Sequence, residues 1–178
     1  MKPQPRPQAG FTLIELIVVI ALLGILAAVA LPRFADLDRE THIASHEATA
    51  AAFATAVNLA RSKWVSLGAP TEMEGRNDVQ LHGSGTDGQI DFNAQGWPAQ
   101  SYAGSDVVIN ADSAADCEDI WPVLLNSSLT ASRNDTTTDY GVTREVNDVC
   151  IYTYRALDGL SFRYETLTGE VVVTNQTD

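Results

Sequence analysis

An apolar run of 21 residues, from Phe11 to Leu31, constrains this chain more than any other feature of its sequence. As an α-helix it would be about 31 Å long, which just spans a hydrocarbon core of about 30 Å. Lys2 and Arg6 lie before the run, so the positive-inside rule keeps this end in the cytoplasm and sends the following residues outward. The run therefore predicts a transmembrane helix that leads into a domain outside the cytoplasm.

The residues after Arg33 have a mixed composition in which Gly, Asn, Asp, Ser and Thr interrupt short apolar runs. The chain has room for about one domain and an accessory segment. Its formal net charge is -12, and it becomes -14 without Lys2 and Arg6. An acidic surface of this kind repels nucleic acid, so we expect no nucleic-acid partner.

Two ordinary membrane signals compete for the apolar run. A secretory signal peptide would use the small residues Ala28 and Ala30 for cleavage, but the run is long for one and continues into another helical segment. A plain signal-anchor fits the length but does not explain Glu15, because an ionisable group in a membrane span costs free energy. No basic residue lies nearby, so within one chain we expect Glu15 to be only a cost.

The stretch "GFTLIELIVVIALLGILAAVALPRF", residues 10–34, resembles the N-terminus of type IV prepilins. This class III signal is found in type IV pilins and in the pseudopilins of type II secretion. The resemblance implies that a prepilin peptidase cuts after Gly10, removes residues 1–10 as a leader and methylates the new N-terminus at Phe11. It also implies that Glu15 pairs with the terminal amine of a neighbouring subunit during assembly.

Gly24 and Pro32 are the helix-weakening residues of the stem, residues 11–32. We expect the helix to hold in lipid and to bend or melt between them once it is packed in a fibre, as pilins of this family commonly do. A kink with no mechanical role is the alternative.

Residues 33–67 contain no Pro or Gly after Pro32 and are rich in Ala, so they predict a continuing helix. Gly68 and Pro70 supply its stop. Its polar first half, residues 36–47, should be exposed in the monomer. Apolar residues at three- and four-residue steps form one stripe that should dock on a sheet: Ala50, Phe53, Val57, Ala60, Trp64 and Leu67.

Two weak metal patterns are present. His42 and His46 stand four apart, as a helical metal clip would require, but only two ligands are visible and an ordinary exposed helix is favoured. Asp87, Asp91 and Asn93 suggest calcium, yet their spacing does not match an EF-hand loop and a solvent-facing acidic loop is favoured. We therefore expect no metal and no other cofactor.

The middle of the chain reads as an irregular segment, residues 68–110, followed by a short helix, residues 113–125. Within the first segment, Val79–Leu81 and Gln89–Phe92 predict a small hairpin, and "AQGWP" predicts a turn. Acidic residues follow Ser113 early in the helix, where negative charge suits the N-terminus. Four of its residues should face inward: Cys117, Ile120, Leu124 and Leu125.

Residues 148–175 carry the clearest strand pattern, because apolar and polar residues alternate strictly in "LSFRYE" between two other short strands. They predict a three-stranded antiparallel meander in which Cys150 shares a face with Tyr152 and Tyr154. The expected fold class is α+β, with a long N-terminal helix packed on a C-terminal antiparallel sheet. This is the pilin fold that the resemblance implies, with a globular domain over residues 33–178.

Cys117 and Cys150 are the two cysteines of the chain, and no zinc-ligand spacing accompanies them. If the domain lies outside the cytoplasm, we expect one disulfide, which would stabilise the fold by about 3 to 4 kcal/mol. Two buried free thiols are the alternative.

The sequence shows no nucleophile with a partner base, no phosphate-binding loop and no metal triad, so we expect a structural subunit and not an enzyme. "GWP", "ADCEDIW" and "CIYTY" are together similar to pilins of the mannose-sensitive haemagglutinin (MSHA) system, closest to its secondary, minor-type pilins. That resemblance implies surface attachment by an extracellular fibre of a Gram-negative bacterium.

The implied partners are other pilin subunits, a prepilin peptidase with methyltransferase activity, and an inner-membrane assembly platform. Before assembly the chain would be a single-pass protein of the inner membrane. A pseudopilin of a type II secretion system is the alternative function. A DNA-uptake pilin is a third, which the acidic composition disfavours.

Overall fold

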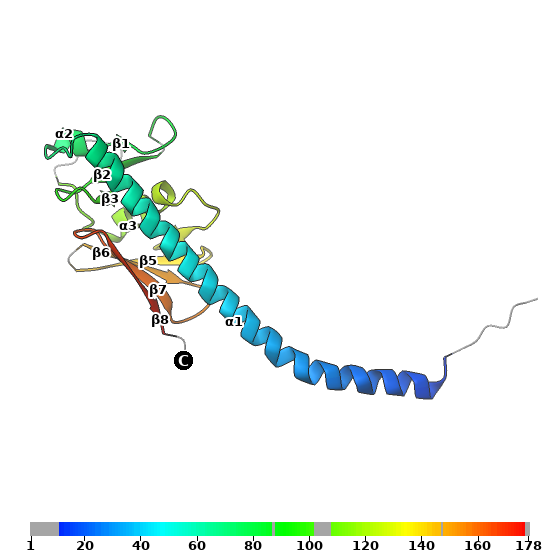
Figure 1. Ribbon diagram of the computed structural model, residues 1–178. Helices are drawn as coiled ribbons and strands as arrows, with labels where there is room; N and C mark the ends of the chain where they lie inside the picture. The colour runs from blue at the N-terminus through cyan, green and yellow to red at the C-terminus, as the bar shows by residue number, and fades with distance from the viewer. Residues whose placement is uncertain (1–10, 87, 102–107, 147, 177–178) are drawn as a thin grey trace, which may run out of the picture. The chain divides into compact units, whose positions relative to one another are not determined.

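We describe the protein from a computed structural model, which defines residues 11–86, 88–101, 108–146 and 148–176. Internal contacts divide the chain into two compact units, Met1–Thr41 and His42–Asp178, and each is described by itself. Both units contain part of helix α1, Leu13–Ser66 (Figure 1).

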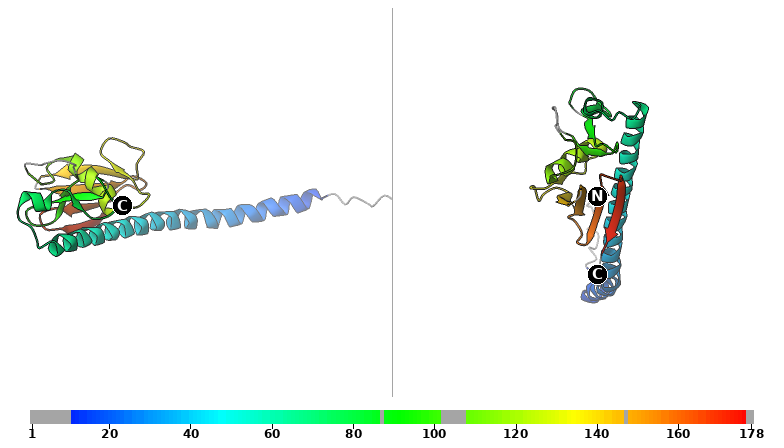
Figure 2. Two further views of the ribbon diagram at one scale, coloured as in Figure 1. Left: turned by 90° about the horizontal axis from the view of Figure 1, so that it is seen from above. Right: turned by 90° about the vertical axis from the view of Figure 1, so that its left-hand side faces the viewer.

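The first unit consists, in its described part, of the apolar portion of α1. Its large apolar side chains are all at least 50% exposed, and Phe11 is 94% exposed. Pro32 lies inside α1 without ending it, and the helix is long and apolar enough to cross a membrane by length and composition. The predicted apolar helix is therefore confirmed (Figure 2).

The second unit is built on a five-stranded sheet with the order β4-β5-β6-β7-β8. Strand β4 pairs in parallel with β5, and every other neighbouring pair is antiparallel. Gly159 and Gly169, with φ of 83° and 76°, supply the left-handed turn residues on either side of β7. The strands are Ala131–Ser132 (β4), Tyr140–Glu145 (β5), Val149–Tyr154 (β6), Leu160–Glu165 (β7) and Glu170–Asn175 (β8).

The predicted meander is confirmed as β6, β7 and β8, and β4 and β5 extend it beyond the prediction. Strand β5 was not predicted, because Gly141 interrupts its run of strand-forming residues. Strand β4 was not predicted either, because a strand of two residues shows no periodicity. Strand β5 is held in the sheet by pairing with the predicted strand β6, and β4 is held there by pairing with β5.

A second, three-stranded sheet has the order β1-β2-β3. The predicted hairpin is present as β1, Val79–Gln80, and β2, Gln89–Phe92, with Val79 opposite Ile90. Strand β3, Pro98–Gln100, and the short helix α2, Met73–Arg76, were not predicted.

Helix α3, Ala114–Leu124, lies beside both sheets (Figure 1). Ser113 caps it, because its side chain accepts the Asp116 N–H while the Asp116 carboxylate accepts the Ser113 N–H. The inward side chains predicted for this helix are buried, as is Trp121, which the prediction omitted.

The core of the second unit lies where α1 covers one face of the five-stranded sheet. Phe53 is fully buried, and its ring centroid lies 5.2 Å from that of Tyr152, 5.3 Å from Phe162 and 5.5 Å from Tyr164. These three side chains belong to the inward-facing set of β6 and β7, so the alternation predicted for β7 is confirmed.

The stripe predicted on α1 is buried from Ala50 to Trp64. The prediction is wrong for its last member, Leu67. Leu67 is 50% exposed, because α1 ends at Ser66 and the chain turns away at Gly68, which has a φ of 89°. A residue beyond the helix end no longer follows the helical period.

The predicted disulfide is confirmed: Cys117 and Cys150 are bonded, with Cα atoms 5.4 Å apart. The bond joins α3 to β6. Tyr152 reinforces the same junction, since its hydroxyl donates to the carbonyl oxygen of Cys117 at 2.7 Å. The alternative of two buried free thiols is therefore wrong.

Removing this disulfide should lower the free energy of unfolding by about 3 to 4 kcal/mol, because the unfolded chain regains the freedom of a loop closed over 33 residues. We expect this loss in the Cys117→Ala/Cys150→Ala double variant of the full chain in detergent, measured by denaturant unfolding followed through tryptophan fluorescence. The wild type measured with a reducing agent is the matched control. Equal stability of the variant and the oxidised wild type would contradict the expectation.

Candidate functional site

The start of α1 brings Thr12 and Glu15 into a reciprocal contact. The backbone N–H and the hydroxyl of Thr12 both donate to Glu15 Oε2, each at 2.9 Å, and the Glu15 N–H donates to Thr12 Oγ1 at 3.3 Å. The Thr12 carbonyl accepts the first helical hydrogen bond, from Leu16. This arrangement is a capping box, which satisfies backbone donors that the first turn of a helix leaves open.

The capping box corrects the expectation that Glu15 is only a cost within one chain. Its carboxylate stabilises the beginning of the apolar helix, and the T-x-x-E spacing in "TLIE" was the signal that could have shown it. Glu15 Oε1 accepts no hydrogen bond from the described residues. Phe11 is 94% exposed, and Gly10, with the expected cleavage point, lies outside the described residues.

Gly24 and Pro32 both lie within an unbroken part of α1. A Cβ atom added at Gly24 would meet nothing within 4 Å, so packing among the described residues does not require a glycine there. Pro32 removes one backbone donor from the helix. The expected bend or melt in a fibre stays a prediction.

His42 and His46 do not lie on an ordinary exposed helix, which the sequence analysis had favoured. His46 is fully buried, with Nδ1 3.2 Å from the Tyr140 hydroxyl oxygen, and His42 is half-buried, with Nδ1 3.0 Å from that of Tyr154. Both continue the apolar stripe of α1 toward its N-terminus at four-residue steps. That spacing was the signal that could have placed them in the core.

The ring of His46 lies in an aromatic cage formed by Tyr140, Tyr154 and Phe162, with each centroid 5.9 Å away. Burial lowers the pKa of His46 below its usual value, and this outweighs the opposite effects of the Ser161 backbone and the Glu47 carboxylate. Its Nε2 makes no hydrogen bond of normal geometry with the described residues. The cage between α1 and the sheet thus favours the neutral form of His46.

The residues considered for calcium have structural partners instead. Asp91 accepts the backbone N–H of Asp78 at 2.6 Å. Asn93 accepts the N–H groups of Gln95 and Trp97, both at 3.0 Å, and so builds the predicted "AQGWP" turn. Asp87 lies outside the described residues. The expected solvent-facing loop is therefore wrong for Asp91 and Asn93, which are both buried.

The "AQGWP" turn is fixed against α1 by stacked groups. The Arg61 guanidinium lies 4.1 Å from the ring centroid of Trp97 and 5.2 Å from that of Trp64. A Cβ atom at Gly96 would approach the Trp64 ring to 2.5 Å, so only glycine fits there. The turn thereby ties the small sheet to the end of α1.

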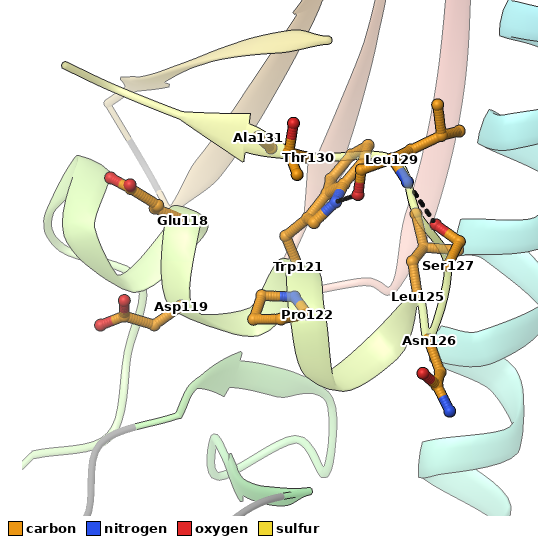
Figure 3. A pocket seen from close by; sticks show the side chains of 10 residues that line it. All are labelled: Glu118, Asp119, Trp121, Pro122, Leu125, Asn126, Ser127, Leu129, Thr130 and Ala131. Atoms are coloured by element: carbon orange, nitrogen blue, oxygen red, sulfur yellow. Dashed lines mark hydrogen bonds between the residues drawn. The ribbon is translucent and has the colours of Figure 1, made fainter. Parts of the chain in front are cut away.

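An open depression of about 430 Å³ lies beside α3 (Figure 3). Two of its polar groups have structural partners: Trp121 Nε1 donates to the Leu129 carbonyl at 3.0 Å, and Glu118 pairs with Arg133 at 3.3 Å. Partial burial raises the pKa of Asp119, as does Glu118, while Arg133 opposes them. Across the described ranges, no group of three or more His, Cys, Asp and Glu could hold a metal ion.

Comparison with known proteins places the capping box inside a described family motif. Residues 5–31 match the model of the prokaryotic N-terminal methylation motif. The match includes Gly10, Phe11 and Glu15.

Several fimbrial proteins are similar to the chain. The type IV narrow pilus major component PilA5 of Thermus thermophilus is 53% identical over 51 residues, which are 29% of this chain and 44% of that protein. The type IV major fimbrial protein FimA of Dichelobacter nodosus is 32% identical over 126 residues, covering 68% of this chain and 78% of that protein. The type IV major alpha-pilin of Moraxella bovis is 49% identical over 53 residues, 30% of this chain and 33% of that protein.

The FimA match extends well beyond the apolar helix into the globular unit, and the helix-plus-sheet architecture agrees with it. The chain therefore belongs to the type IV pilin family, whose members are structural subunits. The match with PilA5 spans less than half of that relative's length. No solved structure matches the chain significantly.

The buried His46 should make stability depend on pH. Its pKa is lowered in the folded protein, so below about pH 6.5 the unfolded chain binds more protons, and stability falls as pH drops from there toward the folded pKa. Protonation of His46 can change the free energy of unfolding by at most about 1.4 kcal/mol per pH unit. Chemical unfolding of the full chain in detergent between pH 7.5 and about pH 5 measures it.

A His46→Leu variant should have a flatter stability profile over this range, because it has no group to protonate in the cage. His42→Gln is the matched control, since it changes a histidine of the same helix but keeps His46 and its slope. Parallel profiles for wild type and His46→Leu would show that His46 does not carry the pH dependence.

Proposed function

We propose that this chain is made as a membrane-anchored prepilin, cleaved after Gly10 and assembled through its apolar helix into an extracellular type IV fibre. The methylation motif over residues 5–31 is the observation that carries the proposal. In the proposed division, residues 1–10 are the leader, 11–32 the membrane and polymerisation segment, and 33–178 the pilin domain.

Glu15 would join neighbouring subunits after cleavage. Its capping box uses only Thr12, which lies on the mature side of the cleavage point, so the cap survives processing. Thr12 occupies Oε2, and Oε1 has no partner among the described residues. The new positive amine on Phe11 of a neighbour is a suitable partner for that oxygen, because opposite charges attract strongly in a low-dielectric fibre core.

The exposed apolar side chains of residues 11–34 suit the chain both before and after assembly. They suit lipid before assembly and other copies of the same helix afterwards. The partners would be a prepilin peptidase with methyltransferase activity, the inner-membrane assembly platform and other pilin subunits. In the fibre, Gly24 and Pro32 would permit α1 to bend or melt between them.

Within this family we favour a displayed pilus of the MSHA type that mediates surface attachment. The "GWP", "ADCEDIW" and "CIYTY" segments support that type. The pilus and fimbrial names of the relatives support a displayed fibre over a pseudopilin of type II secretion, which remains the second candidate. Immunogold labelling of sheared surface fibres distinguishes the two.

Mass spectrometry of the mature protein tests the processing. We expect an N-terminal peptide that begins at Phe11 and carries one extra methyl group. A Gly10→Ser variant, with the rest of the chain unchanged, should keep the leader. A mature chain that begins at Leu31, or that keeps Met1, would overturn the proposal.

Two substitutions at Glu15 separate charge pairing from capping. Glu15→Gln retains an oxygen that can accept from Thr12 but cannot pair with an amine as a charge, and Glu15→Val loses both functions. We expect both variants to insert in the membrane but to yield at most about a tenth of the wild-type fibre mass, because neither can form the charge pair with a neighbouring amine. Normal fibre yield from Glu15→Gln would show that the charge is not needed.

A further inference from the structure

Strand β8, Glu170–Asn175, is an edge strand of the five-stranded sheet (Figure 1). It pairs with β7 in a regular antiparallel register, from Leu160 opposite Asn175 to Glu165 opposite Glu170. Among the described residues no strand pairs with its other side.

Two backbone hydrogen bonds fix which groups of β8 face outward. The Gln176 N–H donates to Gly159 at 2.9 Å, and the Thr166 N–H donates to Asp148 at 3.1 Å. Because backbone direction alternates along an antiparallel strand, both bonds require that positions 170, 172 and 174 face β7. The backbone groups of Val171, Val173 and Asn175 therefore point to the open side.

This edge lacks the usual protection against pairing. Edge strands are commonly blocked by Pro, by Lys or by a bulge, and β8 contains none of these. Its centre is the β-branched run "VVVT", in which Val172 is 41% exposed and Val173 39% exposed. Such a strand favours addition of another extended strand.

We propose that β8 pairs with β8 of a second copy of this chain, in an antiparallel two-fold contact centred on Val173. The outward-facing groups are self-complementary in that register. Val173 meets Val173 of the second copy, and Val171 meets Asn175, with two hydrogen bonds per pair. The side chains of Val172 and Thr174 lie on the other face of the sheet. There Val172 lies opposite Thr174 of the second copy, a favourable pair of β-branched residues.

Charge favours the antiparallel orientation of the second copy over a parallel one. Glu170 is the charged residue of β8, and the register places it opposite the Gln176 amide of the other copy, which can donate to it. A parallel, in-register pairing would instead bring Glu170 beside Glu170, where like charges repel.

Helix α1 leaves room for this contact. Phe53 packs it over β6 and β7, which are set back from the edge by β8. It reaches β8 through the Glu47 carboxylate, which accepts a hydrogen bond from the Asn175 side chain at 2.6 Å and leaves the outward backbone groups of β8 open. In the paired sheet, the two copies of β7 would be separated by three strand spacings, about 14 Å, whereas a helix with its side chains is about 10 Å wide. The parts of α1 that belong to the two globular units, residues 42–66, therefore fit on the same face without overlap.

Subunits within one polar helical fibre are related by a screw operation, so a two-fold contact joins chains that do not belong to the same fibre. If the proposed function holds, β8 pairing would connect pilin domains of adjacent fibres. The pairing itself does not depend on fibre assembly, so it can be measured on the unassembled full chain.

The test uses the full chain in detergent, with sedimentation to measure dimer formation and hydrogen exchange to locate it. We expect a dimer at high concentration and slowed exchange of the Val171, Val173 and Asn175 amides in step with it. Val173→Pro should abolish the dimer, since it removes a central donor while the donors facing β7 remain.

Gln176 provides a test that leaves the strand intact. Gln176→Glu should raise the dimer dissociation constant by a factor between about 2 and 30 at low salt, because two symmetric contacts become like-charge pairs. Gln176→Lys should lower it, and the Glu170→Gln/Gln176→Glu double variant should restore wild-type affinity. Thr153→Glu is the matched control, since it adds the same charge at an exposed position of β6 away from the edge.

A monomer at every concentration, or a dimer that is unchanged by Gln176→Glu and Val173→Pro, would overturn the proposal. The second result would assign the association to the apolar helices. Slow exchange of the β8 amides in a monomer would also overturn it, because another part of the chain would then cover the edge.

Discussion

The contact between α1 and the aromatic face of the five-stranded sheet is the interaction on which the globular unit depends. Phe53 sits at its centre, among rings from β6, β7 and α3. Aromatic side chains bury large areas and gain further from tilted and edge-on geometry. This contact forms the aromatic part of the core and fixes which face of each strand is turned inward.

The tyrosines of that face also organise the surrounding elements. A buried hydroxyl must find a hydrogen-bond partner, and each of these reaches a different one. Tyr152 donates to Cys117 in α3, and Tyr164 donates to Pro98 in β3 at 2.8 Å. Tyr140 and Tyr154 meet His46 and His42 of α1. Burial raises the pKa of Tyr140 to about 12, and those of Tyr152 and Tyr164 well above their usual value, so all three hydroxyls stay protonated.

The N-terminal unit follows a different physical constraint, since its side chains are exposed and its stability rests on helix hydrogen bonds. There the capping box gives Glu15 a role within a single chain before any neighbour is present. Oxygen Oε2 of the carboxylate accepts the hydrogen bonds of the capping box, and Oε1 accepts none from the described residues. A residue that is unfavourable for an ordinary anchor thus stabilises the start of its own helix.

Strong local patterns predicted much of this architecture. The apolar run, the alternation in "LSFRYE" and the helical spacing from Ala50 to Trp64 each reflect the period of one element, and each is confirmed. The strands β3, β4 and β5 were missed because they are short or interrupted and owe their conformation to a neighbour. Local periodicity cannot report a hydrogen bond made by a distant strand.

The sequence by itself determined the membrane-length helix, the methylation motif, the meander and the number of cysteines available for bonding. The helical spacing of α1 is consistent with the burial of His46, but its contact with Tyr140 was decided only by tertiary structure, because Tyr140 lies 94 residues away in a strand that shows little local pattern. The open side of β8 was decided in the same way. Its residues predict a strand, but whether a strand lies inside a sheet or at its edge depends on which other segments pair with it.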